Sequence, residues 1–186
     1  MPSNSEDNHI PSETEAWLHG PLPEVSFLLT PAAHALLQAS IDIERAAAPL
    51  TPKEVWRAPG GAPSVGFHLR HIAGSIDRLL TYARGGQLGA KQLRELSRES
   101  LPGEPAEESV TLVSTVAARI EEAIQALHTT PDELLAEPRV VGRAKLPSTV
   151  FGLLFHIAEH TQRHTGQIIT TARIVRGLPS TEEFQS

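Results

Sequence analysis

The stretch FHIAEHTQRHTGQIITT, residues 155–171, places three histidines four residues apart: His156, His160 and His164. On an α-helix, a four-residue step puts two side chains on one face, about 6 Å apart along the axis. Two imidazoles at that spacing can bind one metal ion, as in zinc enzymes that carry two histidines on one helix. Because protein-bound metals usually have three or more protein ligands, the rest of the chain must supply at least one more.

The apolar residues around this stretch indicate which histidines face the interior. Spaced at about 100° per residue, they form one inward stripe: Val150, Leu153, Leu154, Ile157, Ile168 and Val175. Relative to the middle of that stripe, His164 lies about 30° away, His160 about 70° and His156 about 110°. We therefore predict His160 and His164 as the ligand pair, with His156 leaning toward the rim. The alternative is that these histidines are solvated or hydrogen-bonded neutral side chains.

Length, charge and cysteine content limit the class of protein. The 186 residues suit one domain with a sizeable core. The net charge of −6 comes with scattered acidic residues and no basic patch or aromatic ladder, so no nucleic-acid partner is expected. Cysteine is absent, which excludes disulfides, a cysteine nucleophile and thiolate ligands. No stretch approaches about 20 uninterrupted apolar residues and no signal pattern is present, so we expect a cytoplasmic protein without a membrane partner.

Helical periodicity over most of the chain predicts an all-α fold, a four-helix bundle with long connections. The long helices are expected at residues 31–48, 65–84, 107–128 and 149–176. Thr30, Ser64 and Ser148 are the predicted caps. Short helices are expected at residues 52–56 and 131–136, a helical extension at 91–100, and an extended hairpin arm at 138–145.

The N-terminal residues differ in composition from the bundle. Residues 1–16 are polar and are expected to form a disordered or loosely attached arm, and residues 17–180 a single domain. Residues 17–29 carry several large apolar side chains, which a polar tail would not contain. We expect this segment to lie extended across the bundle or against a partner subunit, which favours a homodimer.

The helix expected at residues 65–84 offers the missing ligand twice. Its sequence GFHLRHIAGSIDRLL, residues 66–80, contains His68 and His71. Periodicity slightly prefers His68, about 70° from the centre of the stripe, over His71 at about 130°. Spacing alone leaves the choice open. His34, in the first expected helix, is either an exposed or capping residue or part of the wall of a metal pocket.

Two motifs resemble the DinB-like (DinB/YfiT-type) superfamily, which includes bacillithiol-type S-transferases. The first is Ser64-Val65 leading to His71-Ile72-Ala73-Gly74-Ser75, and the second is His160-x3-His164 followed by Thr165-Gly166-Gln167. The resemblance spans roughly residues 30–176. It implies a four-helix bundle with a metal site formed by His71, His160 and His164, and so favours His71 over His68.

The resemblance also implies a type of chemistry. A three-histidine site would hold a divalent ion, Zn, Ni, Fe or Mn, because neutral imidazoles discriminate poorly among these. The implied activity is thiol S-transfer, in which a low-molecular-weight thiol attacks an electrophilic small-molecule substrate. Hydrolysis, a non-catalytic metal or small-ligand binding module and a purely structural helical dimer are the alternatives. Gln167 is a candidate to support a ligand, while Asp77 and Glu159 are expected to be solvated charges.

Overall fold

The structure, a computed structural model, describes residues 14–178. Its helices are α1 (Thr30–Ala47), α2 (Pro52–Trp56), α3 (Val65–Ala83), α4 (Ala90–Leu96), α5 (Ser109–Thr129) and α6 (Val150–Gly177). Three 3₁₀ turns, η1 (Ala16–His19), η2 (Pro59–Gly61) and η3 (Asp132–Leu134), and two strands, β1 (Pro138–Val141) and β2 (Leu146–Thr149), complete the described elements. The predicted all-α four-helix bundle is confirmed.

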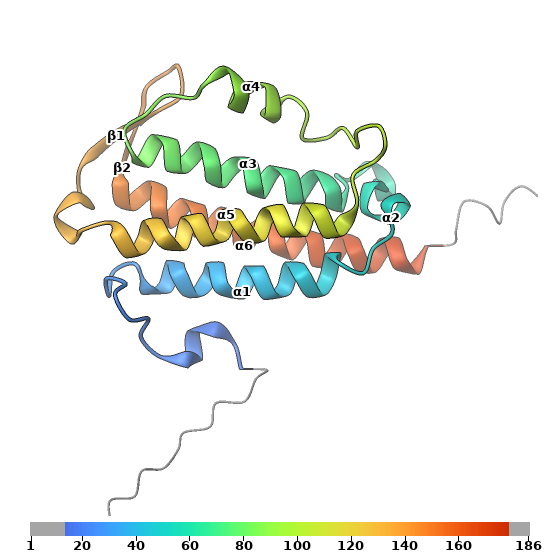
Figure 1. Ribbon diagram of the computed structural model, residues 1–186, viewed down its shortest axis with the longest axis horizontal. Coiled ribbons are helices and arrows are strands. Elements are labelled where there is room, and N and C mark those ends of the chain that lie inside the picture. Colours follow the sequence, from blue (N-terminus) through green and yellow to red (C-terminus); the bar gives the residue numbers. More distant parts are fainter. Residues whose placement is uncertain (1–13, 179–186) are drawn as a thin grey trace, which may run out of the picture.

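The four long helices pack in the order α1–α6–α3–α5 around a common core, and α5 closes the ring against α1 (Figure 1). Helices α1 and α6 run in the same direction, and α3 and α5 run in the opposite one. Gln162 of α6 donates a 2.7 Å hydrogen bond to the carbonyl of Ala35 in α1, which joins the first and last long helices. Parallel neighbours require long connections. The chain between α3 and α5 therefore runs back along the outside of α3, as α4 and an extended segment.

Each long helix begins within two residues of its predicted start, but only one of the three predicted caps is correct. Ser64 accepts a 3.1 Å hydrogen bond from the amide of Phe67 and caps α3, an interaction of about 1 kcal/mol. The cap of α6 is Thr149 rather than Ser148, because the hairpin extends to residue 149 and ends directly at the helix. Thr30 is also not a cap: it is the first residue of α1, and its hydroxyl donates to the carbonyl of Ser26.

The core is formed by the predicted inward stripes. On α6 all of its predicted members are buried: Val150, Leu153, Leu154, Ile157, Ile168 and Val175. Two apolar residues at helical spacing lie outside the core, since Ile41 of α1 is 44% exposed and Val110 of α5 is 62% exposed. Both are rotated by about 100° or more around their helices from the centre of the buried stripe.

The connecting segments differ in detail from the prediction. The helix expected at residues 131–136 is only the 3₁₀ turn η3, and the hairpin arm is β1 paired antiparallel with β2, longer than predicted at its C-terminal end. Before α1, the chain makes the turn η1, whose Ala16 is buried and donates its amide to Gln38. Within the described residues, no helix is long and apolar enough to cross a membrane. Residues 1–13, most of the predicted arm, lie outside the described part.

Candidate metal centre

Helices α3 and α6 are antiparallel neighbours, and this packing brings their histidines together. His71 Nε2 lies 2.9 Å from His160 Nε2. The rings of His160 and His164, one turn apart on α6, have centroids 4.5 Å apart, and the His71 ring lies 4.6 Å from that of His164. One nitrogen from each of the three falls within 4.8 Å of the others. The structure therefore brings together the three side chains that the sequence singled out.

His68 is a fourth member of the cluster. Its Nδ1 lies 3.0 Å from Nδ1 of His164, and the residue is only 3% exposed. Periodicity correctly ranked His68 as inward-facing, and the motif correctly placed His71 beside the α6 pair. One helix can present both because the two residues contact different partners, His164 and His160 respectively.

The histidines are held neutral by their surroundings. Burial, followed by the neighbouring imidazole of His164, lowers the pKa of His68 and of His160 to about 4. Burial, followed by His71, lowers the pKa of His164 to about 4, and a hydrogen bond with Gln167 acts weakly in the opposite direction. Neutral imidazoles keep a lone pair, which is the form that binds a metal ion.

The donor set and its spacing fit a divalent cation. Two nitrogens bound to one tetrahedral zinc at about 2.0–2.1 Å lie about 3.3 Å apart, close to the 2.9 Å between His71 and His160. Nδ1 of His160 is buried and has no hydrogen-bond partner among the residues that the structure describes. Ring nitrogens as crowded as Nε2 of His71 and Nε2 of His160 form the arrangement that a cation between them would stabilise.

Glu99 is a member of the site that sequence reasoning missed. Its Oε2 accepts a 2.7 Å hydrogen bond from Nδ1 of His71, and its Oε1 accepts a 2.8 Å bond from Arg78. Burial raises the pKa of Glu99, but the bonds from His71 and Arg78 outweigh it and hold the pKa below its ordinary value. Since Nδ1 of His71 is committed to Glu99, its Nε2 is left to face His160.

Other residues singled out from the sequence have clear positions. His156 lies on the rim of the cluster, with 47% of its side chain exposed, as predicted. Glu159 is a helix-surface charge that pairs with His156 and Arg163. Gln167 is exposed on α6, one turn from His164, and its supporting role stays a prediction. His156, Glu159, Arg163 and Gln167 follow one another at steps of three or four residues, which places them along one side of α6.

Two residues differ from expectation. His34 was expected to be exposed or capping, or in the pocket wall, and it is buried at 8% exposure with Nε2 unpartnered among the described residues. It is not in the group of three histidines that could hold a metal. Asp77, expected to be solvated, is half-buried because it pairs with Arg119 of α5 and accepts a 2.7 Å hydrogen bond from Gln92.

Fold and site together define a four-helix bundle with a histidine cluster between two of its helices. The sequence profile of the DinB superfamily matches residues 35–168, and the chain belongs to this superfamily. No curated protein matches the chain.

Two solved structures share the fold. A conserved protein from Enterococcus faecalis is 21% identical, with a TM-score of 0.63 over 81% of this chain and 98% of its own. YfiT from Bacillus subtilis is 14% identical, with a TM-score of 0.62 over 84% of this chain and 93% of its own. YfiT is described as a probable metal-dependent hydrolase with an unusual four-helix bundle topology. At these identities the likeness concerns the fold.

Proposed function

We propose that the protein is a metal-dependent enzyme whose divalent ion is held by His71, His160 and His164. The observation that carries the proposal is the convergence of three imidazoles from two helices, with one nitrogen of each within 4.8 Å of the others. Structural zinc sites in proteins are usually closed by four protein ligands, whereas three protein ligands leave a position for a substrate. Three histidines are therefore typical of a catalytic site.

Helix packing and two neighbouring residues position the three proposed ligands. His160 and His164 are fixed one turn apart by α6, so the packing of α6 against α3 sets their distance from His71. His68 contacts His164 and Glu99 contacts His71, and these bonds hold the orientation of two of the three rings. Zn, Ni, Fe and Mn all remain candidates for the ion.

The charge of the ligand set favours an anionic nucleophile. Three neutral imidazoles leave the charge of a divalent ion uncompensated. When bound, such an ion lowers the pKa of a thiol or a water molecule and supplies thiolate or hydroxide near neutral pH. The chain has no cysteine, so in thiol transfer the sulfur must come from a low-molecular-weight cosubstrate. We propose S-transfer from such a thiol to a small electrophile as the leading activity.

Metal-dependent hydrolysis is the second candidate. It would use the same three histidines with water in place of the thiol. The specific observation in its favour is the structural similarity to YfiT, which is described as a probable metal-dependent hydrolase.

The two candidates are separated by one set of assays. Untagged protein, loaded in turn with zinc, nickel, iron or manganese, is incubated with a small thiol such as cysteine and the electrophile 1-chloro-2,4-dinitrobenzene. S-transfer predicts metal-dependent loss of free thiol that a chelator abolishes. Hydrolysis predicts release of nitrophenol from an activated ester without any thiol.

The controls are matched histidine substitutions. His164→Ala should abolish metal-dependent turnover, while His128→Ala, in the last turn of α5, should leave it at the wild-type rate. Turnover that is equal with and without metal, or that survives in His164→Ala, would contradict the proposed function.

We also propose that the protein forms a homodimer. Large apolar side chains before α1 are exposed, with Trp17 at 61% and Phe27 at 89%. Tryptophan and phenylalanine are enriched in protein–protein interfaces.

A further inference from the structure

The connection between α4 and α5, residues 97–108, lies over α3, and we call it the strap. Residues 93–98 and 100–106 are all exposed, whereas Glu99 between them is buried, at 6% exposure. Burying a carboxylate is unfavourable unless the charge is paired and hydrogen-bonded. The burial of Glu99 in an otherwise exposed segment therefore indicates that its carboxylate has a specific role at this position.

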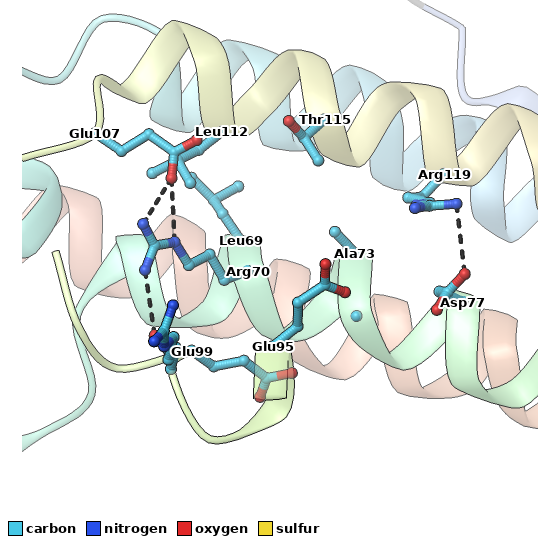
Figure 2. Close-up of a pocket in the computed structure, with 12 residues that line it drawn as sticks. Leu69, Arg70, Ala73, Asp77, Glu95, Glu99, Glu107, Leu112, Thr115 and Arg119 are labelled. Atoms are coloured by element: carbon cyan, nitrogen blue, oxygen red, sulfur yellow. Dashed lines mark hydrogen bonds and ion pairs between the residues drawn. The ribbon is translucent and has the colours of Figure 1, made fainter. Parts of the chain in front are cut away.

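The strap is fixed to α3 independently of Glu99. Arg70 donates two hydrogen bonds to the carboxylate of Glu107, at 3.1 and 2.7 Å, and further bonds to the carbonyls of Arg98, Leu101 and Pro102. Figure 2 shows Arg70 reaching Glu107 at one end of a pocket and Asp77 facing Arg119 at the other. These anchors hold the strap in place, so Glu99 is not required merely to attach it.

Helix α3 is shaped to receive the buried carboxylate. A Cβ atom on Gly74 would lie 2.6 Å from Arg78 Nη1 and 2.8 Å from Glu99 Oε1, both closer than real contacts allow. Glycine in the middle of a helix is destabilising relative to alanine. The space that Gly74 leaves is therefore filled by the Arg78–Glu99 pair, one turn along α3 from His71.

We infer that Glu99 is a positioning residue for the metal centre: it orients His71 through Nδ1, and Arg78 and Gly74 set the place of its carboxylate. This inference rests on the proposed metal-dependent function. A carboxylate that accepts the second N–H of a ligand histidine fixes the ring and its tautomer and makes the other nitrogen a better donor. Here that other nitrogen, Nε2 of His71, is the one that faces His160. The strap thus places the negative charge of Glu99 next to His71, although the strap belongs to neither of the helices that carry the ligands.

The test compares two carboxylates of the strap. Glu99→Gln keeps the size of the side chain and removes its charge, and Glu104→Gln makes the same change at an exposed carboxylate of the strap that is not one of its anchors. Affinity for Co²⁺ and Zn²⁺ is measured by competition with a chelator, and the visible absorption of the Co²⁺ form reports the ligand geometry. We expect Glu99→Gln to weaken binding about 10–100-fold and to shift the Co²⁺ bands, with Glu104→Gln within about twofold of wild type.

A second variant covers the case in which Glu99→Gln does not fold. Gly74→Ala changes no charge and no histidine, favours the helix, and displaces the Arg78–Glu99 pair. It should retain the helical circular dichroism of the wild type and still bind Co²⁺ more weakly. If Glu99→Gln, or Gly74→Ala in its place, matches wild-type affinity and spectrum, the inference is overturned and the proposed function stands. If the wild-type protein itself binds no divalent ion, both are overturned.

Discussion

Lowering the pH of the metal-free protein should weaken the fold through its neutral histidines. His68, His160 and His164 have a pKa of about 4 in the folded chain, whereas an unfolded histidine titrates near 6.5. Because the folded values are depressed, the unfolded state takes up protons first as the pH falls. The free energy of unfolding should be unaffected above about pH 6.5, fall between about pH 6.5 and 4, and level off below.

The size of this loss follows from the position of each ring. A depression from 6.5 to about 4 corresponds to about 3.4 kcal/mol for one fully buried, isolated imidazole. His160 and His164 are only half-buried and screened by solvent, so we expect about 1–2 kcal/mol from each and about 2 kcal/mol from His68. A total of about 4–6 kcal/mol is a large part of the 5–15 kcal/mol that stabilises a typical domain.

The assay is urea unfolding followed by far-ultraviolet circular dichroism, with a chelator present, at intervals between about pH 7 and 4.5. The double variant His160→Gln/His164→Gln should lose about half or more of the pH dependence, and His128→Gln, outside the cluster, should retain it. Equal losses of stability in the wild type and the double variant would refute the reasoning. The acid sensitivity would then belong to groups other than His160 and His164.

Further outcomes are expected for metal binding and assembly. His160→Ala or His164→Ala should reduce the metal content by elemental analysis from about one ion per chain toward zero, and full retention in either would refute the ligand pair. His68→Ala should weaken metal affinity by about the 10–100-fold typical of a residue that orients a ligand, and His71→Ala should weaken it more; the reverse order would show that the roles are exchanged. Light scattering should show that the wild-type protein is a dimer. Trp17→Ala should lower the dimer fraction. A wild-type protein that is a monomer in solution would refute the proposed homodimer.

The long helices and the central histidines could be predicted because their signals are local. Caps such as Ser64 and apolar residues at helical spacing are properties of a few neighbouring positions. The pair His160 and His164 is likewise set by one turn of one helix. The motif favours His71 as the third ligand, and this choice stays a prediction. An idealised helix wheel ranks His71 below His68, although both residues contact histidines of α6.

The parts that were missed depend on tertiary packing. Glu99 reads as one charge among many in a polar stretch, and only the return path of the chain over α3 brings it to His71. His34 looks like a surface residue of a first helical turn, but it is buried. Val110 follows the apolar period of α5 and is nevertheless exposed, since the neighbouring helices do not reach it.

The parallel pairing of α1 with α6 affects how the molecule can be made. Helix α6 covers both α1 and α3 and contributes His160 and His164, yet it is the last element of the described chain to leave the ribosome. About a hundred residues separate the end of α1 from the start of α6, which at about 5–20 residues per second means about 5–20 s of translation. Throughout that interval the side of α1 that packs against α6 lacks its final neighbour, so the nascent polypeptide depends on chaperones or on non-native contacts to cover it. A ribosome that stalls before residue 150 would release neither a closed bundle nor a histidine cluster.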